Sequence, residues 1–409
     1  MSIIKKNQQI SRLLYLSLLS GLTGSILLAA ESVKAVTIQE LDFIGEGNIP
    51  GGTTFSETNV GGLSDITYSG ADDTYSVISD DRNDPRFYTV DIEIDVTSGL
   101  VSPSLLDVTT LKDTSGNPIA PNTSDTEGIV QVGSDVFISS EGIFDDPLST
   151  EASLVVDPFI KNFNGETGNE NAALTIPEKF INSTPTNGVR SNTNFESLTV
   201  TPDESTLFTA VEAPLKQDQD LSFLPPPFGS AQSGLTRIIQ YDEIEGTYTA
   251  GSEFLYETEP LHGLSDLLAI DESTLLVLER GNVSEPFSIK IYEVSLDEAT
   301  DISSIDALGG DTTEVAAVSK DLVLDLNELL LSGELETIAN YDGMTYGATL
   351  PGGESSVVLV SDNGLEGNVN NNFAVFAVET AEPEPIPEPI STFFGLGLVG
   401  LGVWKRSQK

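Results

Sequence analysis

The sequence contains no cysteine and only one histidine, His262, in 409 residues. The absence of cysteine excludes disulfides, thiolate catalysis and cysteine-ligated metal sites. A single histidine excludes histidine-rich metal sites and most histidine-based acid–base pairs. Basic residues are also scarce, because 18 lysines and arginines stand against 64 aspartates and glutamates, for a formal net charge of −46. Binding a polyanion requires a basic face, so we expect no nucleic-acid partner.

The first 35 residues have the layout of a secretory signal peptide. Lys5, Lys6 and Arg12 precede an apolar run over residues 13–30, and small residues around Ala35 suit cleavage after it. A retained membrane anchor is the alternative, because the apolar run is long for a signal peptide. Several serines and glycines inside the run weaken it as an anchor. We therefore expect residues 1–35 to be removed and the protein to be exported to the cell envelope or beyond.

The last 29 residues have a three-part layout. Residues 381–389 (AEPEPIPEP) form a Pro- and Glu-rich spacer, Ile390 to Trp404 is a 15-residue apolar run, and basic residues follow it. This tail resembles the PEP-CTERM sorting signal of exported bacterial proteins, although Ile390 precedes Ser391 where many members have serine directly. The resemblance implies removal by a sorting peptidase after transient membrane contact. A plain C-terminal anchor is the alternative, but fifteen residues are short for a span.

Between these ends, over residues 36–380, the pattern predicts an all-β domain. The expected strands are short, rich in Val, Ile, Thr, Tyr and Phe, and bounded by Gly, Asp, Asn and Ser. Examples are Arg86 to Ile94, Asp135 to Ser140, Thr236 to Tyr241, Ser288 to Val294 and Phe373 to Val378. The only helical signal singled out, Asp325 to Leu331, also fits a strand.

Five hairpins of one design recur along this domain. Each has a small residue near its start and an acidic residue where its second strand ends. The marker residues are 66, 69, 66 and 80 positions apart, and they are Gly62, Gly128, Ser197, Gly263 and Gly343. A regular period of this kind indicates repeats, and about four strands per repeat suit the blades of a β-propeller. A sixth blade could be closed by a strand over residues 38–44; a sandwich and a β-solenoid are the alternative folds.

A propeller would bring equivalent strand ends together around its central channel. The acidic residues expected to meet there as metal ligands are Asp80, Asp81, Glu127, Glu141, Glu212, Asp266, Glu279, Asp342 and Asp362, with Glu196 beside them. So many carboxylates repel one another unless a cation lies between them. Oxygen-only ligands select hard cations, and Ca²⁺ tolerates irregular cages, so calcium is the expected cofactor. The alternative is that several of these acids accept hydrogen bonds within turns.

Three arginines lie close to these acids in the sequence. Arg86 follows Asp80 and Asp81, Arg190 precedes Glu196, and Arg280 follows an acid directly. If they face the channel, arginine forks and a cation together suit a phosphate ester. The hypothesis is therefore that Glu196 and these three arginines are catalytic. The alternative is that each arginine only pairs with a neighbouring acid.

The hairpin motifs resemble a known family. Segments carrying the resemblance include SDDRNDPRFYTVDI, DTEGI, NFESLTVTPDESTLFTAVEAPL, GLSDLLAIDESTLLVLERG and YDGMTYGATLPGGESSVVLVSDN. They are similar to the phytase-like family with esterase-like activity, which is related to the β-propeller phytases. The resemblance implies a six-bladed propeller and calcium-assisted hydrolysis of an ester or phosphoester. Two departures are Ser197, where glycine is usual, and Gly364, where an aromatic residue is common.

Other hydrolase signatures are missing. No G-x-S-x-G elbow and no P-loop occur, so a Ser-His-Asp esterase would depend on His262 alone. Two hypotheses remain. The first is an exported, monomeric, calcium-dependent hydrolase that acts on a small-molecule ester or phosphoester at the acidic mouth of the channel. The second is a non-catalytic propeller, stabilised by calcium, that binds a ligand or organises the envelope.

Overall fold

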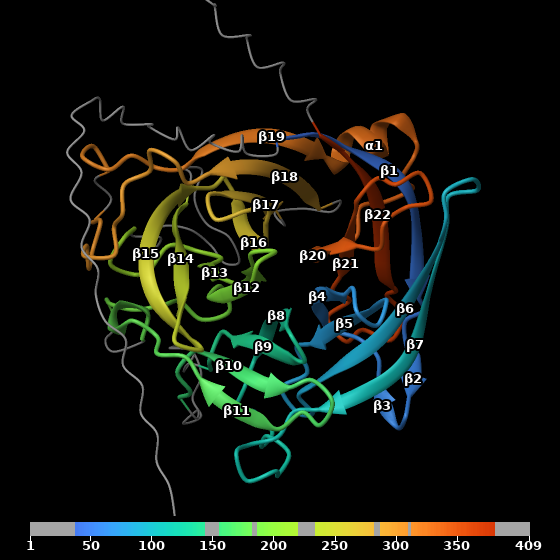
Figure 1. Ribbon diagram of the computed structural model, residues 1–409, viewed down its shortest axis with the longest axis horizontal. Helices are drawn as coiled ribbons and strands as arrows, with labels where there is room; N and C mark the ends of the chain where they lie inside the picture. Colours follow the sequence, from blue (N-terminus) through green and yellow to red (C-terminus); the bar gives the residue numbers. More distant parts are fainter. Residues whose placement is uncertain are drawn as a thin grey trace, which may run out of the picture. The chain divides into compact units, whose positions relative to one another are not determined.

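A computed structural model describes residues 37–143, 155–181, 186–219, 234–281, 287–309 and 312–380 of the chain. These residues form five four-stranded antiparallel sheets arranged as blades around a central channel (Figure 1). The predicted signal peptide and C-terminal sorting segment lie outside the described residues. Within the described ranges, no helix is both long and apolar enough to cross a membrane.

Blades 1 to 4 are each built in sequence order from the inner strand outward. Blade 1 contains β4 (Leu63–Ser69), β5 (Thr74–Ser79), β6 (Arg86–Asp95) and β7 (Leu100–Thr110). Blade 2 contains β8 (Thr126–Val132), β9 (Asp135–Ser140), β10 (Phe159–Asn164) and β11 (Glu170–Ala173). Blade 3 contains β12 (Phe195–Val200), β13 (Thr206–Val211), β14 (Leu235–Ile244) and β15 (Thr247–Glu257). Blade 4 contains β16 (His262–Ala269), β17 (Thr274–Gly281), β18 (Ser288–Ser295) and β19 (Ser319–Asp325).

Blade 5 closes the ring by joining the two ends of the domain. Its inner strands come from the C-terminal part, and they are β20 (Tyr341–Gly347), β21 (Ser356–Ser361) and β22 (Asn371–Thr380). The outermost strand is the N-terminal β1 (Ile38–Ile49), which pairs antiparallel with β22 from Ile38 opposite Thr380 to Ile49 opposite Asn371. The prediction of an all-β propeller is confirmed, whereas the prediction of six blades is wrong. The strand expected to help close a sixth blade instead completes the fifth.

The remaining elements are small. A two-stranded hairpin, β2 (Thr54–Phe55) and β3 (Thr58–Asn59), precedes blade 1, and a 3-10 helix, η1 (Glu178–Phe180), follows blade 2. The helix α1 (Leu326–Ser332) lies at the edge of the ring beside blade 4 (Figure 1). Its N-cap Asp325 accepts a hydrogen bond from the Asn327 backbone N–H, and Gly333 ends it in a left-handed conformation.

The apolar core lies between neighbouring blades. One cluster joins Val77 and Tyr88 of blade 1 to Val358 and Phe373 of blade 5. Another joins Phe208 of blade 3 to residues of blade 4. The five inner strands are buried along most of their length because each sheet is packed between its two neighbouring blades, as blade 1 is between blades 5 and 2. This packing holds the beginnings of the inner strands rigidly around the channel.

Candidate functional site

A β-bulge shapes the beginning of every inner strand. In blade 1, Leu63 pairs with Ser79 and Asp65 with Ile78, so Ser64 is an extra residue. The same one-residue shift occurs at the start of β8, β12, β16 and β20. A bulge of this kind re-aims the side chains beside it. When the five blades are aligned at this shift in strand pairing, the extra residues of blades 1 to 5 are Ser64, Glu127, Glu196, Ser265 and Asp342.

The bulge divides the blades into two classes. In blades 2, 3 and 5 the acid occupies the extra position, as Glu127, Glu196 and Asp342. In blades 1 and 4 that position is serine and the acid follows one residue later, as Asp65 and Asp266. Because strand side chains alternate between faces, a shift of one residue turns the acid away from its counterparts. Contrary to the sequence prediction, Asp266 therefore does not lie with the other acids of the cavity described below.

A second set of equivalent residues follows the second strand of each blade. The backbone N–H of Asp80, Glu141, Glu212 and Asp362 each donates to a carbonyl just before the bulge of the same blade. These positions come from blades 1, 2, 3 and 5, and in blade 4 the equivalent residue is Arg280, which pairs with Gly263. One basic residue thus completes a ring of four acids.

Glu279, the acid predicted for blade 4, takes no part in this ring. Its carboxylate is fully buried and accepts hydrogen bonds from the Tyr256 hydroxyl at 2.6 Å and the Glu259 N–H at 2.8 Å. It also pairs with Lys320 at 2.6 Å. These partners, from blade 4, from β15 of blade 3 and from the connection between them, occupy the side chain, so Glu279 has a structural role in place of the predicted role as a metal ligand.

Most residues of the two sets line a cavity of about 610 Å³, called here the acidic cavity, whereas Ser64, Ser265 and Glu141 are not among its lining residues. Its acidic lining residues are Asp80, Asp81, Asp125, Glu127, Glu196, Glu212, Asp342 and Asp362. Its other lining residues are Arg82, Asn83, Asn122, Asn192, Arg280, Phe287, Asn340 and Leu365. Seven predicted acids and Arg280 therefore meet in one place, as the propeller hypothesis required. Asp125 and Arg82 belong to it as well, although neither was singled out from the sequence.

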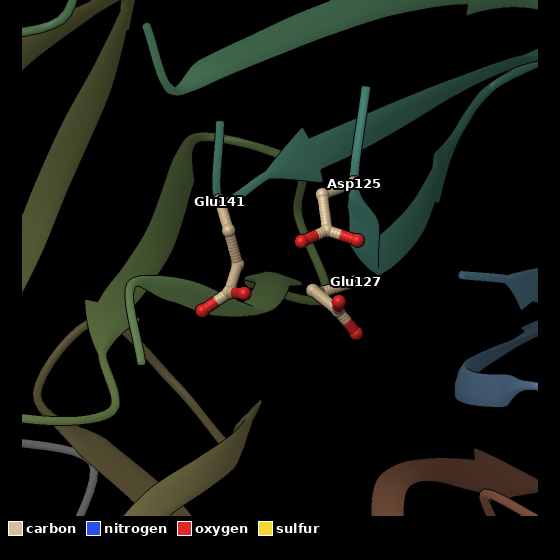
Figure 2. Close-up of side chains that lie close together, drawn as sticks. All are labelled: Asp125, Glu127 and Glu141. Atoms are coloured by element: carbon tan, nitrogen blue, oxygen red, sulfur yellow. The ribbon is translucent and has the colours of Figure 1, made fainter. Parts of the chain in front are cut away.

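Asp125, Glu127 and Glu141 form the tightest group of carboxylates. Each offers an oxygen within 4.8 Å of the others. Figure 2 shows the three side chains lying close together on neighbouring backbone segments. Burial, reinforced by the negative charges of neighbouring acids, raises the pKa of Glu127 and of Glu141 well above the usual range. The group therefore has the donor chemistry of a hard-cation site, with oxygen ligands only and charge that needs neutralising.

Asp80 extends this group toward blade 5. Its Oδ1 atom is buried and has no hydrogen-bond partner among the described residues. Burial and the charges of Asp362, Asp125 and Asp342 raise the pKa of Asp80 to about 8. The same causes, burial and Asp342, raise the pKa of Asp362 to about 6. An orphaned buried carboxylate oxygen is what a bound cation would satisfy, so Asp80 fits the metal-ligand role predicted for it.

Gly62 makes room for the Asp80 carboxylate. A Cβ atom on Gly62 would lie 1.7 Å from Asp80 Oδ1, and its φ is +59°. Gly133 has nearly the same φ, +58°, but nothing lies within 4 Å of its Cβ position. We expect Gly62→Ala to abolish most of any thermal stabilisation that added calcium gives, because Asp80 must move. Gly133→Ala carries the same backbone penalty of about 1 kcal/mol and is the matched control. Calorimetric melting with calcium and with chelator measures both; equal calcium responses would contradict this role of Asp80.

Arg280 and Arg82 are the two arginines of the acidic cavity. Arg280 pairs with Glu212 at 2.9 Å and with Asp342, while its buried Nε has no partner among described residues. Burial alone would lower the pKa of Arg280, but Asp342 and Glu212 outweigh burial and raise it. Arg82 pairs with Asp125, and 41 % of its side-chain surface stays exposed. Both are placed to bind an anionic group in the cavity.

The other two predicted arginines lie elsewhere. Arg86 is fully buried and donates to the Tyr88 hydroxyl at 2.7 Å and to Asp81 at 2.9 Å. Arg190 donates to the carbonyl oxygens of Pro214 at 2.8 Å and Gln219 at 2.5 Å. Neither is among the described residues that line the acidic cavity. The predicted catalytic role of these two therefore has no geometric support, and Arg86 instead positions Asp81.

His262 also lies outside the cavity lining. Its Nε2 is 3.0 Å from the Ser288 hydroxyl and its Nδ1 is 3.1 Å from the Pro260 carbonyl oxygen. The described part of the chain thus shows no serine–histidine pair in the acidic cavity.

The shifted acids of blades 1 and 4 meet each other across the channel. Asp65 accepts backbone hydrogen bonds from Ile66 at 2.6 Å and Ile129 at 2.7 Å. Asp266 accepts equivalent bonds from Leu267 at 2.7 Å and Met344 at 2.6 Å. Burial and the charge of Asp266 raise the pKa of Asp65 well above the usual range, and burial raises the pKa of Asp266 in the same direction. Together they join blades 1, 2, 4 and 5.

Comparison with known proteins identifies one family. The family model described as phytase-like, with esterase-like activity of phytase, matches residues 58–365, which is more than half of the chain. No curated protein matches. Structural similarities are weak, and the five-bladed architecture rests on the strand pairing described above.

Three solved structures illustrate this level of similarity. The Dos1 propeller is 10% identical, with a TM-score of 0.32, over 79% of this chain and 69% of its own. An α-L-arabinofuranosidase from Lactobacillus brevis is 10% identical, with a TM-score of 0.40, over 80% and 96%. A periplasmic gluconolactonase from Pseudomonas aeruginosa is 12% identical, with a TM-score of 0.32, over 85% and 94%.

Proposed function

We propose, from the premise that this chain belongs to the phytase-like family, that it is a calcium-dependent hydrolase of phosphoesters or related esters. Family membership supports a hydrolase-like function. The observation that carries the rest is the acidic cavity, where eight carboxylates and two arginines line one space of about 610 Å³. A cation and an anionic substrate group can both be bound there without leaving either charge unpaired.

Asp125, Glu127 and Glu141 would hold the cation, with Asp80 as a further ligand. All four residues offer only oxygen ligands. The oxygens of Asp125, Glu127 and Glu141 lie within 4.8 Å of one another. When bound, calcium would polarise the ester oxygens and lower the pKa of a water. Arg82 already neutralises part of the charge of Asp125. The four acids belong to blades 1 and 2, so the cation site would lie on one side of the channel.

The chain's own residues would bind the substrate and move protons on the other side. The Arg280 guanidinium, with Nε unpartnered, would bind an ester or phosphate oxygen. Glu196 lines the same cavity, and burial with the charges of Glu141 and Glu212 raises its pKa well above the usual range. A carboxyl group that keeps its proton toward neutral pH suits proton transfer, so we assign Glu196 to that role.

Export remains part of this proposal. The signal-peptide layout of residues 1–35 and the sorting-signal layout of residues 381–409 support an envelope or extracellular location. The ring is closed by β1 and β22, whose described residues start at Ile38 and end at Thr380. Removal of both terminal segments would therefore leave the described propeller intact.

A non-catalytic, calcium-stabilised propeller is the second candidate. It is favoured by the placement of Arg86 and Arg190, which bind protein groups away from the cavity. In that case the acidic group would only hold blades together through the cation. The two candidates differ in whether the protein hydrolyses an ester. Both require that it binds calcium.

The deciding experiment uses residues 36–380, purified without the terminal segments. Hydrolysis of a phosphomonoester, a phosphodiester and a short-chain carboxylic ester is followed with calcium and with chelator. Calcium-dependent turnover of any of the three supports the proposed hydrolase and names its ester class. Absence of turnover on all three, with a melting temperature still raised by calcium, would replace it with the binding propeller.

A further inference from the structure

A second cavity of about 450 Å³ lies beside the acidic cavity and is called here the amide pocket. The two cavities share Phe287, Asn340 and Asp362 as lining residues. A group bound in the acidic cavity would therefore have its remaining atoms within reach of the amide pocket. The question is which chemistry the amide pocket accepts.

Its polar lining is mostly uncharged. Besides Asn340 it contains Asn363, Asn370 and Asn372, together with the hydroxyls of Thr337 and Ser361. The charged lining side chains among the described residues are the acids Asp362 and Glu366. The internal segments outside the description contain no lysine or arginine in their sequence. The amide pocket therefore opposes a second phosphate or carboxylate and favours a neutral polar group.

Asn372 supplies an acceptor that the protein leaves unused. Its side chain is 8 % exposed, and its amide nitrogen donates to Glu46 Oε1 at 2.9 Å. Its Oδ1 is buried without a partner among the described residues. An unsatisfied buried acceptor destabilises the protein, and a hydroxyl donor from a ligand would offset that cost.

Two neighbours supply donors. Asn370 accepts the Gly51 N–H at 3.1 Å through Oδ1, so its amide nitrogen remains the part able to donate to a ligand. Ser361 accepts the Asn372 N–H at 2.7 Å, so its hydroxyl proton can point elsewhere. Phe287 adds an aromatic surface at the junction of the cavities. Amide acceptors, amide and hydroxyl donors and one aromatic ring together match a group with several hydroxyls and an apolar ring face.

We infer that the amide pocket binds the uncharged, polyhydroxylated part of the substrate, a sugar or cyclitol ring. Its single ester group then lies in the acidic cavity. The placement of the ester group in the acidic cavity rests on the proposed function. The binding of the ring in the amide pocket does not depend on it. It also implies that a ring carrying many phosphates is a poor substrate, because the extra phosphates would lie against Asp362 and Glu366.

The first test compares calcium-dependent kcat/KM for glucose 6-phosphate, methyl phosphate and myo-inositol hexakisphosphate. We expect glucose 6-phosphate to exceed methyl phosphate by about tenfold or more, mainly through KM, and to exceed the hexakisphosphate. Asn370→Leu and Thr337→Leu should each reduce the ratio of glucose 6-phosphate to methyl phosphate several-fold. Asn171→Leu, on the outer strand β11, is the control and should leave this ratio unchanged. An unaltered ratio in both pocket variants, or a preference for the hexakisphosphate, would overturn the inference.

The second test separates the inference from the proposed function. Binding of glucose itself, which has no ester, is measured by ligand-observed NMR on residues 36–380 and on the Asn370→Leu and Thr337→Leu variants. Binding by the parent protein that both variants weaken supports the pocket assignment even if no ester is hydrolysed. Hydrolysis of phosphoesters without any glucose binding would leave the hydrolase standing and reject the pocket assignment.

Discussion

Glu127→Gln should reduce calcium-dependent kcat/KM by at least about 100-fold. Glu127, Asp125 and Glu141 each offer an oxygen within 4.8 Å of the others. Glutamine keeps the shape of the side chain but removes the negative charge, so the group loses one of its three carboxylate ligands. In the proposed mechanism the metal supplies transition-state charge stabilisation, so we expect its loss to appear in kcat/KM for every substrate. Steady-state kinetics across a calcium titration measures the effect.

The same substitution should stabilise the protein when calcium is absent. Burial and the charges of Glu196 and Asp125 raise the pKa of Glu127 well above the usual range, which shows that its charge is unfavourable there. A higher melting temperature in chelator together with lost activity would show that the variant folds and lacks only the metal site. Glu257→Gln, on an exposed residue at the end of β15, is the matched control and should change neither quantity. Near-normal activity with unchanged calcium affinity in Glu127→Gln would remove the acidic group from the mechanism.

Raising the pH from 5 to 8 in the presence of chelator should lower the melting temperature by roughly 5 °C. The pKa of Asp80 is raised to about 8 and that of Asp362 to about 6, in both cases first by burial. An unfolded aspartate has a pKa near 4. Between pH 4 and 8 the folded protein therefore holds protons that the unfolded chain has released. Stability from these two groups is complete below pH 4 and is lost as the pH rises through 6 and then 8.

Excess calcium should reverse this trend. Metal ligands must be deprotonated, so calcium affinity rises over the same range of pH, and binding to the folded state alone adds stability. Differential scanning calorimetry at pH 5, 6.5 and 8, with calcium and with chelator, measures both slopes. Asp80→Asn should reduce the dependence of the melting temperature on pH in chelator and should weaken the stabilisation by calcium. Asp203→Asn, at an exposed turn, should leave both quantities unaltered. A melting temperature in chelator that rises with pH would contradict the raised pKa values.

The register of the bulges explains which sequence predictions succeed. Glu127, Glu196 and Asp342 were identified from a repeated small-residue marker, and they occupy one equivalent position in three blades. Asp266 was aligned with them, but in its blade a serine takes that position. The signal was present in the sequence, because GLSD occurs in blades 1 and 4 whereas an acid precedes Gly or Ser in the other three. The two patterns can be distinguished only with the knowledge that a bulge lies here, because the extra residue of the bulge is the one whose side chain reaches the cavity.

Asp125 and Arg82 were missed for a different reason. Both lie inside motifs that had been recognised, DTEGI and SDDRND, next to acids that were singled out. Asp125 precedes Glu127 by two residues, and only its position ahead of the bulge brings it beside Glu141 from the neighbouring strand end. Arg82 reaches Asp125 across 43 residues. Contacts between residues so far apart depend on how blades 1 and 2 pack, which local patterns do not encode.

The sequence by itself determined the all-β class, the five repeated hairpins and the gathering of acids at their strand ends, because these follow from local residue patterns. The sequence shows five repeats, but the prediction was six blades, because of the family resemblance and the unassigned N-terminal strand. Only the tertiary structure decided that β1 pairs with β22, that Arg280 and not Glu279 completes the ring, and that Asp65 and Asp266 meet each other. Ring closure joins residues more than 300 positions apart, and side-chain direction alternates at every strand residue. A one-residue bulge or one long-range pairing therefore decides which charges share the cavity.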